Sequence, residues 1–507
     1  MLPGETRKNG ISMKRNTILL LVMLVIIAAC TPPCLASNSL ILGYSETDLD
    51  TKLVSGYFES IRNNPNELQA FFRAMPKGGD LHNHLSGAVY AEDMIDISAR
   101  HGLLVDPATG QLGDANSTAP GLVPVSSAYS NATLYSSIVD EWSMRDYPEN
   151  TGSGREWFFG TFGLIGPAKV YQGEMIAALR DRAAKEHVMY IETMMHIPGR
   201  YPAVAQVEAN VSWNGNFSEM REALLDAGLK DICRQNADAL AAYDARSWEF
   251  AGPGGKNITM RYIYEAGRNY PKMDVYTDLV QAFETANQSP LVVGINLVGE
   301  EDAYYSRTDY PLHMEMIAYL HSVYPGVPIA LHAGEQTIGL VPPEALKFHV
   351  SDAVNTGKAS RIGHGVDIMF EEGAHATLAE MRRLDIPIEI LLTSNEEILH
   401  VSGPYHPVSV YLAYQVPVII GTDDPGVERT DLTEQYVELA LQHPGVSYEQ
   451  IRAINTNSIR YAFLSEPEKG ELLGRFNGDL NRFEGTIANR FTSPLYSFDL
   501  SGPLKVS

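Results

Sequence analysis

Apolar residues recur at helical spacing between residues 46 and 73, ahead of any strand-like segment. The pattern breaks at Asn63-Asn64-Pro65, where the residue types favour a turn. We therefore expect two short lead-in helices on the N-terminal side of the main domain.

Beyond residue 76, short apolar or β-branched segments alternate with longer segments of helical periodicity. This alternation is typical of βα units, and eight parallel strands close a barrel. The predicted fold class is α/β, a (β/α)8 TIM barrel. The eight predicted strands are Gly79–His84, Val188–Met194, Met260–Glu265, Val292–Val298, Pro328–His332, Arg361–Val366, Ile386–Leu392 and Val416–Thr422. The helices predicted between them are Glu174–Lys185, Thr277–Ala286, His313–Tyr324, Pro343–Asn355, Ala374–Arg383 and Thr433–Leu441.

The interval between the first and second predicted strands breaks this rhythm. It holds about a hundred residues, whereas a crossover needs about a dozen. Residues 103–150 are rich in Gly, Ser, Asn, Pro and Thr, which predicts a long excursion over the barrel mouth. Glu156–Phe159 then resumes an amphipathic helix. A long insertion after the first strand thus spans about residues 103–155.

These patterns divide the chain into four parts. They are a targeting segment at 1–36, a helical extension at 37–75, the barrel at 76–475 and a C-terminal tail at 476–507. From residue 466 onward the chain is expected to be irregular, apart from a helix at Glu468–Leu473.

The first part resembles an export signal. A basic pair, Lys14-Arg15, precedes an apolar run at residues 18–29, which is shorter than the about 20 residues of a membrane-spanning helix. The small residues before Cys30 resemble a bacterial lipobox, which would place a lipid anchor on that cysteine. Cleavage near Ala36 and an uncleaved short anchor are the alternatives. We expect an exported protein, either a membrane-anchored lipoprotein or a secreted or periplasmic one.

Cysteine content excludes a disulfide scaffold. The chain has only Cys30, Cys34 and Cys233, although a single bridge is compatible with an oxidising compartment. We expect Cys233 to be a buried apolar residue.

Acidic residues outnumber basic ones by 62 to 38, which gives a net charge of −24. A surface of this charge repels phosphate backbones and anionic headgroups, so nucleic acid is excluded as a partner. A small neutral substrate would feel little of this field.

Polar residues suited to metal binding gather at the carboxyl ends of the predicted strands, where such a barrel places its active site. His82 and His84 are two apart on the first strand, so both imidazoles point to the same side. His332 ends the fifth predicted strand and Asp423 follows the eighth. Three imidazoles and one carboxylate, with an open position for water, favour one zinc ion. Such an ion lowers the pKa of bound water to about 7.

Two further residues complete a proton-transfer set. His364, on the sixth predicted strand, is placed to orient the water and take its proton. Glu335, three residues past His332, need not bind the metal and is free to act as an acid toward a ring nitrogen. Each motif alone is more often a turn or a structural loop residue, so their shared position at strand ends is what favours catalysis.

These residues lie in motifs that resemble those of the adenosine deaminase family of metal-dependent hydrolases. The resemblance runs in order from about Met75 to Thr433. The lead-in helices, the insertion and the export signal resemble the secreted, growth-factor-related branch of that family. The motifs are MPKGGDLHNHL at 75–85, NLVGE at 296–300, HAGE at 332–335, RIGHG at 361–365, TSN at 393–395 and GTDDP at 421–425.

The resemblance implies zinc-dependent hydrolytic deamination of adenosine, and of 2′-deoxyadenosine, to inosine and ammonia. It implies that the four ligands hold zinc, that Glu335 protonates the purine at N1 and that His364 positions the attacking hydroxide. Gly299 and Asp424 would bind the purine edge. The implied partner is thus a small-molecule purine nucleoside.

Two departures from related proteins matter. Family members of the cytosolic type carry Asp where this chain has Ser86, and that Asp helps bind the ribose 5′-hydroxyl, so sugar recognition at Ser86 is open. The fourth strand end also lacks the Lys whose carbamate bridges two metals in related barrels, which again predicts one metal.

Two alternatives stay open on the sequence alone. One is a deaminase of adenine or of another aminopurine or modified nucleoside, which the serine at position 86 favours. The other is a surface-anchored nucleoside-binding or signalling protein without turnover, and the complete proton-transfer set speaks against it. The sequence leaves the oligomeric state open.

Overall fold

The computed structural model describes residues 46–147, 153–196 and 201–492. The chain divides into two units, residues 1–49 and 50–507. The predicted targeting segment, with Cys30 and its lipid anchor, lies outside the described residues, so export stays a prediction. Within the described ranges, no helix is both long and apolar enough to span a bilayer.

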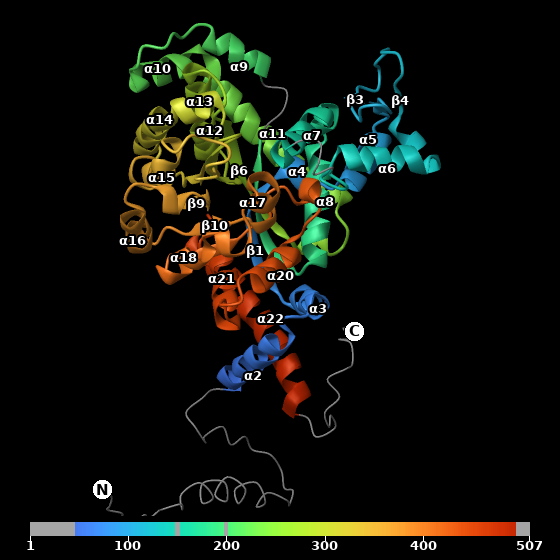
Figure 1. Cartoon of the computed structure of the whole chain (residues 1–507). Helices are drawn as coiled ribbons and strands as arrows, with labels where there is room; N and C mark the ends of the chain where they lie inside the picture. The colour runs from blue at the N-terminus through green and yellow to red at the C-terminus, as the bar shows by residue number, and fades with distance from the viewer. Residues whose placement is uncertain (1–45, 148–152, 197–200, 493–507) are drawn as a thin grey trace, which may run out of the picture. The chain divides into compact units, whose positions relative to one another are not determined.

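Eight parallel strands form a closed barrel (Figure 1). They pair in chain order as two four-stranded halves, and single bridges between Asn83 and Asp423 and between Ile295 and Ile329 join the halves. All eight predicted strands and the (β/α)8 fold class are confirmed. The strands are β1 (Lys77–His84), β5 (Val188–Met195), β6 (Thr259–Gly267), β7 (Val292–Val298), β8 (Ala330–Ala333), β9 (Arg361–His364), β10 (Ile388–Ile390) and β11 (Val418–Ile420).

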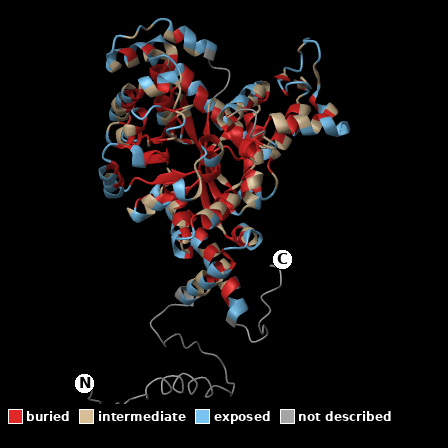
Figure 2. Cartoon of the chain, viewed as in Figure 1, coloured by how far each residue is buried: buried red, intermediate tan, exposed pale blue. Residues whose placement is uncertain are grey.

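The strands are buried almost throughout, while exposed residues lie on the outer helices (Figure 2). This burial explains why the strands appear in the sequence as apolar runs rather than as alternating patterns. The predicted helices are present, except that Pro343–Asn355 is a 3-10 turn at Ala345–Lys347 followed by a short α-helix. The outer helices are α8 (Gln172–Lys185), α12 (Lys272–Gln288), α14 (Tyr310–Val323), α15 (His349–Asn355), α16 (Ala374–Leu384), α20 (Leu432–Gln442) and α21 (Tyr448–Arg460).

The two lead-in helices are confirmed as α2 (Glu46–Ile61) and α3 (Pro65–Ala74). The side chain of Asn64 accepts the Glu67 N–H and so caps α3, and Pro65 occupies a first-turn position that needs no amide donor. The same residue types that end the first helix therefore begin the second.

The expectation of an irregular C-terminal part is wrong for residues 466–492, while residues 493–507 lie outside the described ranges. Residues Glu466–Thr492 form one helix, α22, so the boundary placed at residue 475 falls inside it. Phe476 and Leu480 are fully buried on this helix. Glycines at 470, 474, 478 and 485 hid its pattern, because glycine lowers helix propensity by about 1 kcal/mol per residue while tertiary packing can override it.

The insertion covers the barrel mouth only in its last part. Its first part is a small antiparallel sheet with a following helix that packs on α5 (Ala91–Arg100), and Figure 1 shows β3 and β4 standing away from the barrel strands. The part that reaches the mouth includes Met144, whose N–H donates to the Val427 carbonyl, and α7 (Gly154–Leu164). The elements of the first part are β2 (Leu104–Val105), β3 (Leu112–Gly113), β4 (Val123–Pro124) and α6 (Ala132–Glu141).

A second insertion, which the sequence did not predict, lies between β5 and β6. It contains α9 (Tyr201–Glu208), α10 (Phe217–Leu224) and α11 (Lys230–Phe250). Helix α11 packs against α8 and α12, and so serves as the crossover helix of this βα unit. Cys233 lies on α11 and is fully buried, as expected.

Candidate metal centre and active site

The four predicted metal ligands meet at the carboxyl end of the barrel. The Nε2 atom of His332 lies 3.2 Å from the Nε2 atoms of both His82 and His84. Oδ1 of Asp423 lies 3.6 Å and 3.4 Å from the same two nitrogens. These four donor atoms, all within 4.8 Å of one another, are of the types that bind zinc and lie close enough together to share one ion.

Each ligand histidine is oriented through its other ring nitrogen. The Nδ1 contacts are His82 to Glu389 at 2.7 Å, His84 to Glu265 at 2.6 Å and His332 to Asn296 at 2.9 Å. Because all three partners are oxygen acceptors, the Nδ1 atoms carry the protons and three Nε2 lone pairs face one another. Lone pairs at such distances repel unless a cation lies between them, so the donor set fits a metal.

The charges around His84 also favour a cation. Burial alone would lower the pKa of His84, but nearby carboxylates, Asp424 first, outweigh it and raise the pKa to about 10. The pKa of His332, by contrast, is lowered by burial and by His82, so His332 is neutral. A divalent ion would meet the demand for positive charge while leaving the imidazoles deprotonated.

Local backbone geometry supports the centre. Asp423 and His364 adopt left-handed backbone conformations, with φ of 60° and 68°, which cost about 1–3 kcal/mol each for residues other than glycine. At position 363 a Cβ atom would lie only 2.5 Å from Cε1 of His82, so glycine is required there. The absence of a side chain at Gly363 thus leaves room for the His82 ring between closely packed strands.

His364 lies beside the ligands in a defined tautomer. Its Nδ1 accepts a hydrogen bond from the Asn395 amide at 3.0 Å, and the Asn395 carbonyl accepts one from Nε2 of His406 at 3.0 Å. The proton of His364 is therefore on Nε2, which lies 3.8 Å from Oδ2 of Asp423. Burial lowers the pKa of His364 to about 3, so the ring is neutral. With its proton on Nε2, His364 can donate a hydrogen bond that orients a water molecule. To accept a proton from that water at Nε2, the ring would need its proton on Nδ1 instead.

Glu335 faces the same space from the β8 loop. Its Oε1 lies 3.7 Å from Nδ1 of His364, and its side chain is about one-tenth exposed. Burial, followed by the Asp423 and Glu301 carboxylates, raises the pKa of Glu335 well above its usual range. The protonated carboxyl that an acid catalyst needs is thereby favoured.

The residues expected to contact substrate lie at the same barrel end. Asp424 is buried, and its Oδ1 has no hydrogen-bond partner among the described residues. A Cβ at position 87 would lie 1.6 Å from that oxygen, so Gly87 makes room for it. Gly299 follows β7 with φ of 103°, and Ser86 is half-buried on α4 (Leu85–Ala88).

An apolar cluster covers the loops that follow β9, β10 and β11. Helix α7 supplies part of it and is tied to the opposite side by Arg155, which pairs with Glu300 at 3.2 Å and with Asp302 at 2.7 Å. The buried members of the cluster are Met144, Phe158, Val366, Ile398, Leu399 and Val427, with Tyr147, Trp157, Phe159 and Phe162 packed against them.

A family model described as adenosine deaminase matches residues 230–477. Over 151 residues the chain is 36% identical to an adenosine deaminase of Vibrio cholerae, and over 145 residues it is 37% identical to one of Escherichia coli. These matches support the adenosine deaminase family as the family that this chain resembles. The first match covers 30% of this chain and 42% of that relative, and the second covers 28% and 40%.

Solved structures of similar fold cover most of the chain. An adenine deaminase of Arthrobacter aurescens superposes with a TM-score of 0.52 at 17% identity, covering 80% of this chain and 98% of that one. A zinc-bound amidohydrolase of Burkholderia ambifaria gives 0.54 at 18%, covering 83% and 94%, and the N6-methyl-AMP deaminase of Arabidopsis thaliana gives 0.51 at 19%, covering 81% and 98%. These likenesses show the fold. The growth-factor-related branch stays a prediction.

Sequence reasoning missed the residues that orient the ligands. No orienting role was predicted for Glu265, Glu389 or Asn296, although two of them are acids inside otherwise apolar strands. An acid within a buried strand needs a cationic or hydrogen-bonding partner, and that was the available signal. Identifying a hydrogen-bond acceptor for each ligand histidine would have strengthened the prediction of a metal site.

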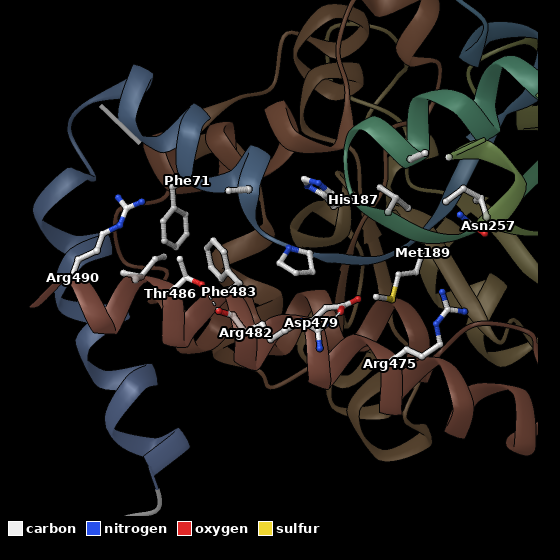
Figure 3. Close-up of a pocket in the computed structure, with 17 residues that line it drawn as sticks. Phe71, His187, Met189, Asn257, Arg475, Asp479, Arg482, Phe483, Thr486 and Arg490 are labelled. Atoms are coloured by element: carbon white, nitrogen blue, oxygen red, sulfur yellow. Dashed lines mark hydrogen bonds and ion pairs between the residues drawn. The ribbon is translucent and has the colours of Figure 1, made fainter. Parts of the chain in front are cut away.

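A separate cavity of about 560 Å³ lies at the opposite, amino end of the barrel (Figure 3). Its lining includes Val188 at the start of β5, Ile258 just before β6, and side chains from α22 such as Phe483. It contains none of the predicted site residues, so it is distinct from the metal centre.

Proposed function

We propose that this protein catalyses the zinc-dependent hydrolytic deamination of adenosine and 2′-deoxyadenosine to inosine and ammonia. The observation that carries the proposal is the convergence of three Nε2 lone pairs and the Asp423 carboxylate beside Glu335. The matched segment spans about two fifths of the curated adenosine deaminases (42% of the first), so the proposal combines family resemblance with site geometry.

The side chains can divide the chemistry among them. Bound by the four ligands, zinc would lower the pKa of a water molecule to about 7 and supply hydroxide at neutral pH. The Nε2–H of His364 orients the water oxygen toward C6 of the purine, and the Glu335 carboxyl donates its proton to N1. A bond forms between the oxygen and C6, one proton of the water restores the Glu335 carboxyl, and the other is transferred to the amino nitrogen. The bond from C6 to that nitrogen then breaks, and ammonia leaves.

The purine itself fits the remaining groups. Burial raises the pKa of Asp424, so its carboxyl can be protonated and donate a hydrogen bond to a ring nitrogen. The backbone at Gly299 can bind another edge of the base. The apolar cluster under α7 offers a dry cover for a planar ring, which fits an aromatic substrate better than an open-chain amide.

A second candidate is a deaminase of adenine or of a modified aminopurine nucleoside. The serine at position 86 favours it, because Ser86 replaces the acid that contacts the ribose in the cytosolic type. The same fold also serves the adenine deaminase and the N6-methyl-AMP deaminase named above. Such an enzyme would use the same metal, acid and base-binding groups.

The test is a deamination assay with purified, zinc-loaded protein. We expect the absorbance of adenosine to fall as inosine and ammonia appear in equal amounts. A panel of adenosine, 2′-deoxyadenosine, adenine and N6-methyladenosine separates the two enzyme candidates. Intact nucleoside after prolonged incubation with zinc-loaded protein would reject both and support binding without turnover.

A further inference from the structure

We propose that Arg268 and Glu301 form a buried clamp that positions Glu335 relative to the metal ligand His332. The inference rests on the proposed function, because it assigns two positioning residues to the same reaction. Both side chains are fully buried, and neither contributes a predicted metal ligand.

The clamp holds residues 332–335 from two sides. Nη2 of Arg268 donates to the backbone carbonyl of His332 at 2.8 Å. The carboxylate of Glu301 accepts the backbone N–H of Gly334 at 3.0 Å and that of Glu335 at 2.7 Å. Because Nη1 of Arg268 also lies 3.9 Å from Oε2 of Glu301, the two side chains pair with each other. One ion pair therefore connects the peptide of the ligand with the peptide of the acid.

The conformation of this segment explains why it needs a buried anion. Gly334 has φ of 77°, and its N–H and the next one both point to Glu301. Consecutive amides around a left-handed residue form a concavity that binds an anion. On another side, a Cβ at position 334 would lie 2.4 Å from Oδ1 of Asp367, so the segment has no free space there.

Glu301 is held as an anion by its own partners. His349 contacts Oε1 at 2.5 Å and stacks on Tyr310 with ring centres 3.8 Å apart. Burial would raise the pKa of Glu301, but His349 and Arg268 outweigh it and lower the pKa to about 2. The fixed carboxylate therefore accepts from the two amides across the neutral pH range.

The clamp is tested with Glu301→Gln, which keeps the size of the side chain but replaces one acceptor oxygen by a donor. We expect kcat for adenosine to fall about 10- to 100-fold, because small displacements of a catalytic group have effects of this size. KM should stay within about threefold and zinc content should stay unchanged. Hydrogen exchange of the amides at 334 and 335 should accelerate at least about tenfold, because their acceptor is weakened.

Two variants complete the design. Arg180→Lys is the matched control. Arg180 is equally buried, and its Nη2 atom lies 2.7 Å from Oδ1 of Asp244 in an ion pair that is not part of the metal centre. This control should lower Tm without changing kcat or the exchange of amides 334 and 335. If Glu301→Gln does not fold, Arg268→Lys keeps the charge but loses the second guanidinium nitrogen, so it cannot contact both His332 and Glu301 as the arginine does, and it should show the same changes to a smaller degree.

Faster exchange together with a lower kcat at constant zinc content supports the clamp. Wild-type exchange at both amides overturns it, and so does a rate loss explained wholly by lost zinc. The exchange measurement needs no turnover. A wild-type protein that does not deaminate any aminopurine would therefore refute the proposed function, while the exchange rates alone would still decide on the clamp.

Discussion

At the scale of single residues, protonation states determine what the metal centre can do. The oxygen partners of the three ligand histidines keep their protons on Nδ1, and Asn395 keeps the proton of His364 on Nε2. Three rings are thus prepared to bind a cation and the fourth to donate a hydrogen bond. Glu335, with its raised pKa, is the group prepared to give up a proton.

Replacing Glu335 with Gln tests its role as the acid. The amide has the same shape but no transferable proton, so we expect kcat to fall about 10²- to 10⁴-fold. Zinc content, measured by elemental analysis, and Tm should match the wild type. Glu344→Gln makes the same change at an exposed position nearby in the sequence. It serves as the control and should leave kcat unchanged. Wild-type rates in Glu335→Gln would refute the assignment.

Replacing Glu265 with Ala tests the orientation of a ligand. The variant removes the acceptor that lies 2.6 Å from Nδ1 of His84, and loss of such partners costs about 10- to 100-fold in metal affinity. We expect that loss in a chelator competition titration. Glu315→Ala, which removes an exposed acid on α14, gives the same change of charge and should leave affinity unchanged.

The candidate ligands and the acid could be predicted from sequence because they occur at the ends of recognisable strands. His82 and His84 share one face by strand alternation alone, and His332 and Asp423 follow apolar runs. Glu301 and Arg268 could not be predicted in this way. Their role depends on how the loop after β8 turns at Gly334, and no local pattern encodes that contact.

At the scale of elements, strands were easier to predict than the segments outside the repeated units. The eight strands are short apolar runs bounded by turns. Only residues 468–473 of helix α22 were predicted, because its glycines weaken the local signal, while its apolar residues lie at helical spacing and pack on the domain. The α9–α11 insertion was missed because it interrupts the βα rhythm used for prediction.

Phe476→Ala tests whether α22 belongs to the folded domain. Phe476 is fully buried, and truncation of such a ring costs about 3–5 kcal/mol of unfolding free energy. We expect this loss in urea denaturation, with little change in kcat because the helix lies far from the metal ligands in the fold. Asn477→Ala, at the adjacent exposed position, should change stability by less than about 0.5 kcal/mol. Equal stabilities would contradict the packing of α22.

At the scale of the whole molecule, the barrel brings to one end side chains that lie far apart in the sequence. They come from β1, β8 and β9 and from the residues just after β11. His82 lies on β1 and Asp423 follows β11, and the single bridge between Asn83 and Asp423, which only a closed barrel allows, brings these two segments together. The net charge of −24 surrounds this site with a negative field. That field repels or attracts a charged substrate but does not change the chemical step.

The field predicts a contrast between substrates in salt titrations. We expect kcat/KM for neutral adenosine to change little between low and high NaCl concentrations. For adenosine 5′-monophosphate, kcat/KM should be lower at low salt and rise with salt, because ions screen the repulsion over about 10 Å at 0.1 M. A value for the monophosphate that falls with salt would indicate a local cationic site and contradict the prediction.

We propose above all that His82, His84, His332 and Asp423 share one zinc ion next to Glu335. A crystal structure of zinc-loaded protein, with anomalous diffraction collected on both sides of the zinc absorption edge, tests it most directly. We predict one anomalous peak, about 2.0–2.2 Å from Nε2 of each of the three histidines and from an Asp423 oxygen. A peak elsewhere, two peaks in the site, or none at full zinc loading would contradict the account.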